Sequence, residues 1–158
     1  MNMRYFDAHC HIQFEQYAHD EEEIIARMRE RGIAGIVVGV DVISSKKAIA
    51  LAAVHEHLFA SVGLHPNRVL QEPFAMETFR ALAAHPNVVA IGECGLDYFR
   101  LPFVALAKEG PAEVNDEVKN RQKEILQKHI KLAIELDKPL IIHARPSKGT
   151  MDAYTDVI

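Results

Sequence analysis

Short apolar runs alternate with longer amphipathic runs along the chain, and this alternation restricts the fold more than any other feature of the sequence. The apolar runs are rich in Val, Ile and Leu and lack regular polar alternation. That pattern is typical of strands buried on both faces of a parallel sheet. We expect strands at residues 4–8, 34–40, 59–64, 88–92 and 139–143.

The amphipathic runs between these strands predict helices, several of them with recognisable ends. Asp20 precedes three glutamates and is a candidate N-cap, and Gly32 follows the last turn of the same segment. Ser44 is a candidate cap for the second helix, and Pro86 ends the third. We expect helices at residues 20–31, 44–57, 74–85, 116–137 and 151–158.

The order of elements is therefore a β-α unit repeated five times, which implies a parallel sheet with right-handed crossovers. An insertion at residues 98–117 contains two prolines and a glycine, and we expect it to be a long loop. The 158 residues suffice for one domain, residues 1–158, whereas a (β/α)₈ barrel needs roughly 250. The pattern alone leaves open either a five-stranded α/β sheet or the front part of an interrupted barrel.

Composition and charge exclude some classes of function. Apolar residues make up 49% and charged residues 25% of the chain, which is the balance of a soluble globular protein. No apolar run is long enough to span a bilayer, and the N-terminus lacks a signal-peptide pattern, so we expect a cytoplasmic protein without a membrane partner. The net charge of −4 argues against a broad basic face for nucleic acid, although bound cations could supply positive charge locally.

His9 and His11 are the first candidate metal ligands. Side chains alternate along a strand, so these two imidazoles share one face while Cys10 faces away. Two imidazoles on one face, at the end of a strand, form half of a metal site. An isolated pair of this kind is also compatible with two surface histidines.

Glu93 and His143 follow two other apolar runs. Glu93 lies between Gly92 and Gly95 in the sequence Ile-Gly-Glu-Cys-Gly, and the glycines would let backbone or a ligand approach closely. A carboxylate there must be paired or bind a cation. His143 ends the run Pro-Leu-Ile-Ile-His, and Arg145, two residues on, would point the same way. Taken alone, Glu93 is equally compatible with an ion pair to a nearby arginine, and a single histidine in the place of His143 is more often a core residue than a ligand.

Together these residues favour one site over several independent explanations. The carboxyl ends of parallel strands meet at one rim, where active sites form. Three imidazoles and a carboxylate suit Zn²⁺, Mn²⁺ or a similar divalent ion. His65 ends the third strand in the same way and could contact substrate or support a ligand. We interpret Cys10 and Cys94 as small buried hydrophobes. We interpret the remaining histidines as solvated or helix-terminal residues: His19, His55, His57, His85 and His129.

Four motifs taken together resemble the TatD-type deoxyribonucleases, metallo-hydrolases of the amidohydrolase-like group with TIM-barrel folds. The motifs are Phe-Asp-Ala-His-Cys-His at 6–11, Val-Gly-Leu-His-Pro at 62–66, Ile-Gly-Glu-Cys-Gly-Leu-Asp-Tyr at 91–98 and Lys-Pro-Leu-Ile-Ile-His-Ala-Arg at 138–145. They occur in family order across the chain. The resemblance implies an α/β fold of the (β/α)₈ TIM-barrel type, truncated to about five βα units.

The resemblance also implies a two-metal phosphodiesterase that acts on DNA, with up to two ions of Mg²⁺, Mn²⁺ or Zn²⁺. His9, His11 and His143 match ligand positions, and Glu93 matches the carboxylate that bridges the metals and is catalytic. His65 and Arg145 match positions that meet the substrate phosphate. The family pattern also has a His after the sixth strand and an Asp after the eighth, which would lie beyond residue 158.

These expectations leave three functions to compare. The first is a TatD-like nuclease that cleaves DNA phosphodiester bonds with a metal-activated water. The second is a non-catalytic, truncated metal-binding barrel fragment, whose exposed sheet edges we expect to be covered by self-association or by the missing barrel half. The third is a metallo-hydrolase of an ester or amide outside nucleic acid. The motifs favour the first, and the acidic charge favours the other two.

Overall fold

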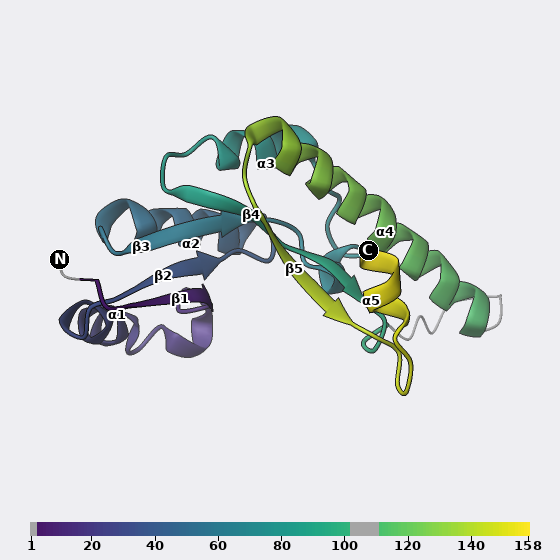
Figure 1. Cartoon of the computed structure of the whole chain (residues 1–158), viewed down its shortest axis with the longest axis horizontal. Helices are drawn as coiled ribbons and strands as arrows, with labels where there is room; N and C mark the ends of the chain where they lie inside the picture. The colour runs from purple at the N-terminus through teal and green to yellow at the C-terminus, as the bar shows by residue number, and fades with distance from the viewer. Residues whose placement is uncertain (1–2, 102–110) are drawn as a thin grey trace.

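Five parallel strands form one sheet in the order β1-β2-β3-β4-β5, as the alternating pattern predicts. The structure is a computed structural model that describes residues 3–101 and 111–158. Figure 1 shows that the sheet curls, with β1 and β5 as its two edges. The strands are β1 (Tyr5–Cys10), β2 (Ile33–Val38), β3 (Leu58–Val62), β4 (Val88–Asp97) and β5 (Leu140–Arg145).

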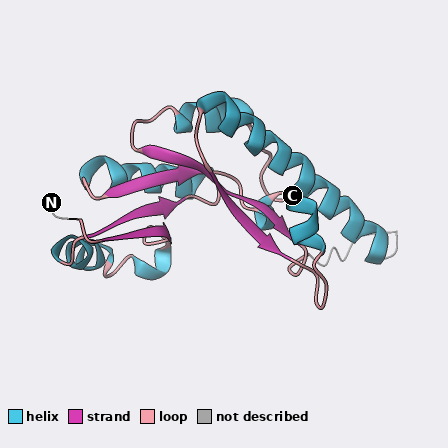
Figure 2. Cartoon of the chain, in the orientation of Figure 1, coloured by secondary structure: helices cyan, strands magenta, loops and turns pink. Residues whose placement is uncertain are grey.

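Helices follow the strands in sequence, so the fold is α/β and corresponds to part of a (β/α)₈ barrel (Figures 1 and 2). The helices are α1 (Glu21–Glu30), α2 (Val42–Val54), α3 (Met76–Ala83), α4 (Pro111–Leu136) and α5 (Asp152–Val157). Two short 3₁₀ turns, η1 (Glu15–Tyr17) and η2 (Pro66–Arg68), follow β1 and β3. No helix in the described part of the chain has the length and apolar character needed to cross a bilayer.

Two helices begin earlier than predicted. Asp41, not Ser44, is the N-cap of α2, because its carboxylate accepts from Ser44 N at 2.7 Å while its own N–H donates to Ser44 Oγ at 3.0 Å. Helix α4 begins at Pro111, so the prediction of a loop through residue 117 is wrong for its last residues. Proline suits a first helical position because its missing N–H has no helical partner there. The rest of the predicted loop, residues 102–110, lies outside the described residues.

The main core lies between the sheet and the helices and includes Val62, Phe79, Ile91 and Leu132, all fully buried. A second cluster around Leu96 joins β4 and β5 to α4 and α5. The two edge strands, β1 and β5, are less completely buried than this core.

Large apolar side chains are exposed on both edges of the sheet. On β1, Tyr5 is 67% and Phe6 49% exposed, and Ile142 on β5 is 43% exposed. Unpaired parallel edge strands carrying exposed apolar residues are rare in isolated domains.

The interpretation of His129 and His57 as solvated or helix-terminal is wrong, because both are buried. His129 lies on α4 and is fully excluded from solvent. Its Nδ1–H donates to Ile125 O at 2.8 Å, and its Nε2 accepts from Leu64 N at 3.0 Å. Helix α4 is thereby hydrogen-bonded to the backbone at the end of β3, using the neutral form of the ring. Burial lowers the pKa of His129 to about 4.

We expect this buried histidine to make the protein less stable in mild acid. The unfolded chain binds the proton near pH 6.5, whereas the folded chain binds it only near pH 4. The stabilisation is therefore complete above pH 6.5 and is lost as the pH falls toward 4. The contribution of His129 to the free energy of unfolding should drop by roughly 2 kcal/mol between about pH 7 and about pH 5.

Urea unfolding of His129→Gln at both pH values measures this loss, because glutamine can still accept from Leu64 N but takes up no proton. The variant should be less pH-dependent than wild type by that amount. His19→Gln, at an exposed position, is the matched control and should behave like wild type. An unchanged pH dependence in His129→Gln would contradict the prediction.

Candidate metal centre

The structure brings His9, His11, His65, Glu93 and His143 to one place, although they come from four strands. His9 lies on β1, His11 follows β1 directly, and His65 lies three residues after the end of β3. Glu93 and His143 lie within β4 and β5, before the strands end. Parallel strands in one sheet present these positions at the same rim, which is where sites form in this architecture. The five side chains that the sequence analysis selected therefore do lie together, at one rim of the sheet.

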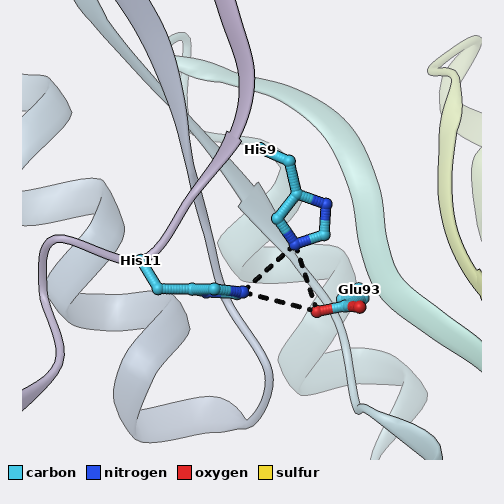
Figure 3. Close-up of side chains that lie close together, drawn as sticks. All are labelled: His9, His11 and Glu93. Atoms are coloured by element: carbon cyan, nitrogen blue, oxygen red, sulfur yellow. Dashed lines mark hydrogen bonds and ion pairs between the residues drawn. The ribbon is translucent and has the colours of Figure 1, made fainter.

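Glu93 is the centre of the cluster, and its two oxygens face different imidazoles. Oε2 lies 3.4 Å from His9 Nε2 and 3.7 Å from His11 Nε2 (Figure 3). Oε1 lies 3.2 Å from His143 Nδ1 and 3.7 Å from His65 Nε2. Donor atoms form two groups that share Glu93, one with His9 and His11 and one with His65 and His143, each with its atoms within 4.8 Å of one another.

The backbone around Glu93 depends on glycine. Gly92 and Gly95 have φ values of +144° and +136°, a region that favours glycine over other residues. A side chain at Gly92 would meet the backbone of Ile141, and one at Gly95 would meet the backbone of His143. The two glycines thus let β5 approach β4 closely enough for His143 to reach Glu93.

The hydrogen bonds of His11 prepare it to bind a metal. Its Nδ1 lies 3.0 Å from Val38 O, so Nδ1 carries the proton and donates it. The lone pair of Nε2 then faces Glu93. Phe14 stacks on the ring with centroids 4.6 Å apart, which fixes its plane. Burial lowers the pKa of His11, so the ring is neutral and can act as a ligand.

His65 has the opposite arrangement of donor and acceptor. Its Nδ1 accepts from Asn67 N at 3.1 Å, so in the neutral ring the proton lies on Nε2, which faces Glu93. Burial lowers the pKa of His65 to about 4, which keeps the ring neutral. His65 therefore presents a hydrogen-bond donor to the site, although its distance alone would also suit a metal ligand.

Asp97 orients His143, and the sequence analysis did not select it. Asp97 Oδ2 lies 3.1 Å from His143 Nε2, and Asp97 is fully buried. In the neutral ring, with the proton on Nε2 donated to Asp97, the Nδ1 lone pair would be directed toward Glu93. Carboxylates commonly hold metal-binding histidines in this way. Strand alternation, which paired His9 with His11, also puts residues 93 and 97 on one face and could have identified Asp97.

The charges of Glu93 and His143 favour each other. Burial alone would raise the pKa of the Glu93 carboxyl, but the hydrogen bond with His143 and the nearby His65 and His9 hold it below its ordinary value. Burial alone would lower the pKa of His143, but Glu93 and Asp97 raise it. Without a cation, the pairing with Glu93 therefore favours the protonated form of His143, whose charge offsets that of the carboxylate. A divalent ion would displace that proton and supply the positive charge instead.

Arg145 contacts an aromatic ring rather than a carboxylate. Its guanidinium lies 4.0 Å from the centre of the Phe99 ring, and Phe99 is 51% exposed. Arg145 is the last residue of β5 and pairs with Asp97 in the β4–β5 register, so it lies at the same rim as the histidines. Stacking of this kind holds a guanidinium flat without using its N–H groups.

Comparison with known proteins gives a matching family model and several relatives. The family model described as TatD related DNase matches residues 6–157. The uncharacterized metal-dependent hydrolase YabD of Bacillus subtilis is 34% identical over 157 residues, which are 97% of this chain and 53% of YabD. The 3'-5' ssDNA/RNA exonuclease TatD of Salmonella typhimurium is 31% identical over 142 residues, which are 89% of this chain and 49% of that protein.

A solved structure also matches. The crystal structure of YjjV, a TatD homolog from Escherichia coli K12, superposes with a TM-score of 0.73 at 30% sequence identity, covering 92% of this chain and 52% of YjjV. The chain thus spans about half the length of the curated relatives it matches.

Replacing Asp97 tests whether the histidine beside it binds a metal. In Asp97→Asn the side-chain amide would donate to His143 Nε2, so the ring proton would move to Nδ1 and face the metal position. We expect affinity for Mn²⁺ or Zn²⁺, measured by calorimetry, to fall roughly 10- to 100-fold. Asp156→Asn is the control, because Asp156 accepts from Tyr98 and Lys123 away from the cluster. Equal affinities in both variants would refute this role of Asp97.

Proposed function

Because the chain belongs to the TatD-related DNase family, we propose that it is a divalent-metal-dependent hydrolase that cleaves phosphodiester bonds of nucleic acid. The observation that carries this proposal is the carboxylate of Glu93, which divides its oxygens between the His9 and His11 pair and His143. Three imidazoles and one shared carboxylate suit a divalent transition ion such as Zn²⁺ or Mn²⁺.

We propose His9, His11, Glu93 and His143 as the metal ligands. A bound ion would polarise the phosphate and lower the pKa of a coordinated water. His65, with its Nε2–H directed into the site, would donate to a phosphate oxygen. Arg145 would add its guanidinium N–H groups to the phosphate from the stacked position over Phe99.

The proposed substrate is DNA, and the name of the Salmonella relative, an exonuclease of single-stranded DNA and RNA, favours a strand with a free 3' end. A strand end needs no broad basic face, which agrees with the net charge of −4. The negative charge of the substrate would be met locally by the metal, His65 and Arg145.

The test is metal binding and cleavage measured on the same preparation. A 5'-labelled single-stranded oligonucleotide shows whether nucleotides leave from the 3' end. His9→Ala and Glu93→Gln should each reduce cleavage on the order of 100-fold or more, because they remove ligand atoms from the shared centre. Glu124→Gln is the matched control for the glutamate, since Glu124 is 60% exposed and pairs only with Arg121 among the described residues.

A second candidate function, favoured by the net charge of −4, is a non-catalytic barrel fragment that binds metal. Stoichiometric metal without cleavage by wild type would support it over the nuclease. Cleavage of a simple ester without cleavage of DNA would instead point to a hydrolase with another substrate. No bound metal would contradict the site.

We also infer that the two edges of the sheet are covered. Tyr5 and Phe6 on β1 and Ile142 on β5 are exposed, and within the described residues each edge strand pairs with only one neighbouring strand. A second copy of the chain or further strands of the same barrel would bury them. If a second copy does so, sedimentation of the chain alone at micromolar concentration should show a dimer or larger species. Phe6→Glu should shift it toward monomer. A wild-type chain that remains monomeric would contradict self-association.

A further inference from the structure

A cavity of about 410 Å³ opens beside Glu93 and contains two arginines that the metal centre does not use. Glu93, His11 and His65 form the part of its wall that belongs to the candidate metal centre. Arg68 and Arg100 lie in the rest of its lining. A cavity that joins a proposed phosphodiesterase centre to two guanidinium groups is suited to an anionic substrate.

Arg68 is held in place rather than free in solvent. Its Nη1 donates to Gln71 Oε1 at 3.0 Å, and its Nε lies 3.9 Å from Asp41 Oδ2. Asp41 is itself fixed as the N-cap of α2. The side chain of Arg68 is still 48% exposed, and no contact to its Nη2 is present among the described residues. A guanidinium held on one side with free N–H groups on the other loses little entropy when it binds an anion.

The backbone ties Arg68 to His65. The 3₁₀ turn η2 (Pro66–Arg68) begins directly after His65. Arg68 N donates to His65 O at 2.8 Å, and Asn67 N donates to the ring of His65 at 3.1 Å. One short turn therefore fixes both the imidazole that faces Glu93 and the arginine that lines the cavity, so their separation is set by local structure.

Arg100 is tied to the other side of the same centre. Asp97, whose Oδ2 orients His143, uses Oδ1 to accept from Phe99 N at 3.2 Å and from Arg100 N at 2.9 Å. This turn brings Arg100 to the cavity directly after β4. The two arginines thus come from the ends of neighbouring strands, and each is placed by a residue of the centre.

We propose that Arg68 and Arg100 bind a phosphate of the nucleic acid strand next to the phosphate that is cleaved, and so set the position of the strand. The inference rests on the proposed function, since it assumes that the cleaved bond lies at Glu93. A guanidinium group can donate two parallel hydrogen bonds to the oxygens of one phosphate, and it keeps its charge at all physiological pH values. Contacts to phosphate carry no base preference of their own. The arginines are positioning residues and do not touch the reacting atoms.

Binding measured without metal tests this inference separately from cleavage. The probes are fluorescein-labelled (dT)₁₀ and (dA)₁₀, followed by anisotropy in EDTA. Arg68→Ala should weaken binding of both roughly tenfold and lower the slope of log affinity against log salt by about 0.7, the value for one single-strand phosphate contact. Arg68→Lys, which retains the charge but not the planar fork, should fall between wild type and Arg68→Ala. Arg100→Ala should weaken binding in the same way.

Arg27→Ala is the matched control, because Arg27 lies on α1 with 53% exposure and pairs with Glu23. It removes the same charge and should leave the affinity within about twofold of wild type, since its charge is screened from the site. Equal losses in Arg27→Ala and Arg68→Ala would overturn the inference, because only net charge would then matter. A loss confined to one base would overturn it as well. If Arg68→Ala weakens binding but the metal-loaded wild type cleaves nothing, the proposed function fails and the phosphate site stands.

Discussion

Glu93 is a carboxylate placed where little water reaches it, and the arrangement of the surrounding strands answers that constraint. An isolated charge in such a place would be strongly unfavourable, so the group must be neutralised. Four imidazoles converge on its two oxygens from β1, β3 and β5. The glycines before and after it allow β5 to come close enough for His143 to take part. His143 can therefore offset the charge of Glu93 only because β4 and β5 approach each other closely.

Hydrogen bonds behind the imidazoles decide what each ring offers to the centre. Val38 O leaves His11 with a lone pair directed inward, and Asp97 does the same for His143. The N–H of Asn67 has the opposite effect on His65, which is left with a donor. Distance alone would group His65 with the candidate ligands, but the pattern of protons separates rings suited to bind a metal from one suited to donate to an oxygen. The hydrogen bonds around each ring thus give histidines of the same site different proton positions.

Much of this site could be predicted from the sequence because it follows from periodicity. Strand alternation put His9 and His11 on one face, and the shared rim of parallel strands put Glu93 and His143 beside them. Periodicity also puts Asp97 on the same face as Glu93, but it could not reveal Arg68 or Arg100 as parts of the site, because their places depend on the turns that follow β3 and β4. His129 was misinterpreted for a related reason. It lies on an amphipathic helix, and only the packing of α4 against the end of β3 shows that the ring is inside the core.

The turn after β4 has a consequence for how such a chain can vary. Asp97 serves His143 with one oxygen and the backbone of Phe99 and Arg100 with the other, while its own N–H and C=O are hydrogen-bonded to Gln122 on α4. The imidazole, the turn that carries Arg100 and the helix packed behind them therefore all depend on one side chain and its backbone. A substitution at residue 97 would disturb all three together, so related proteins should vary little at this position while they vary freely at exposed ones.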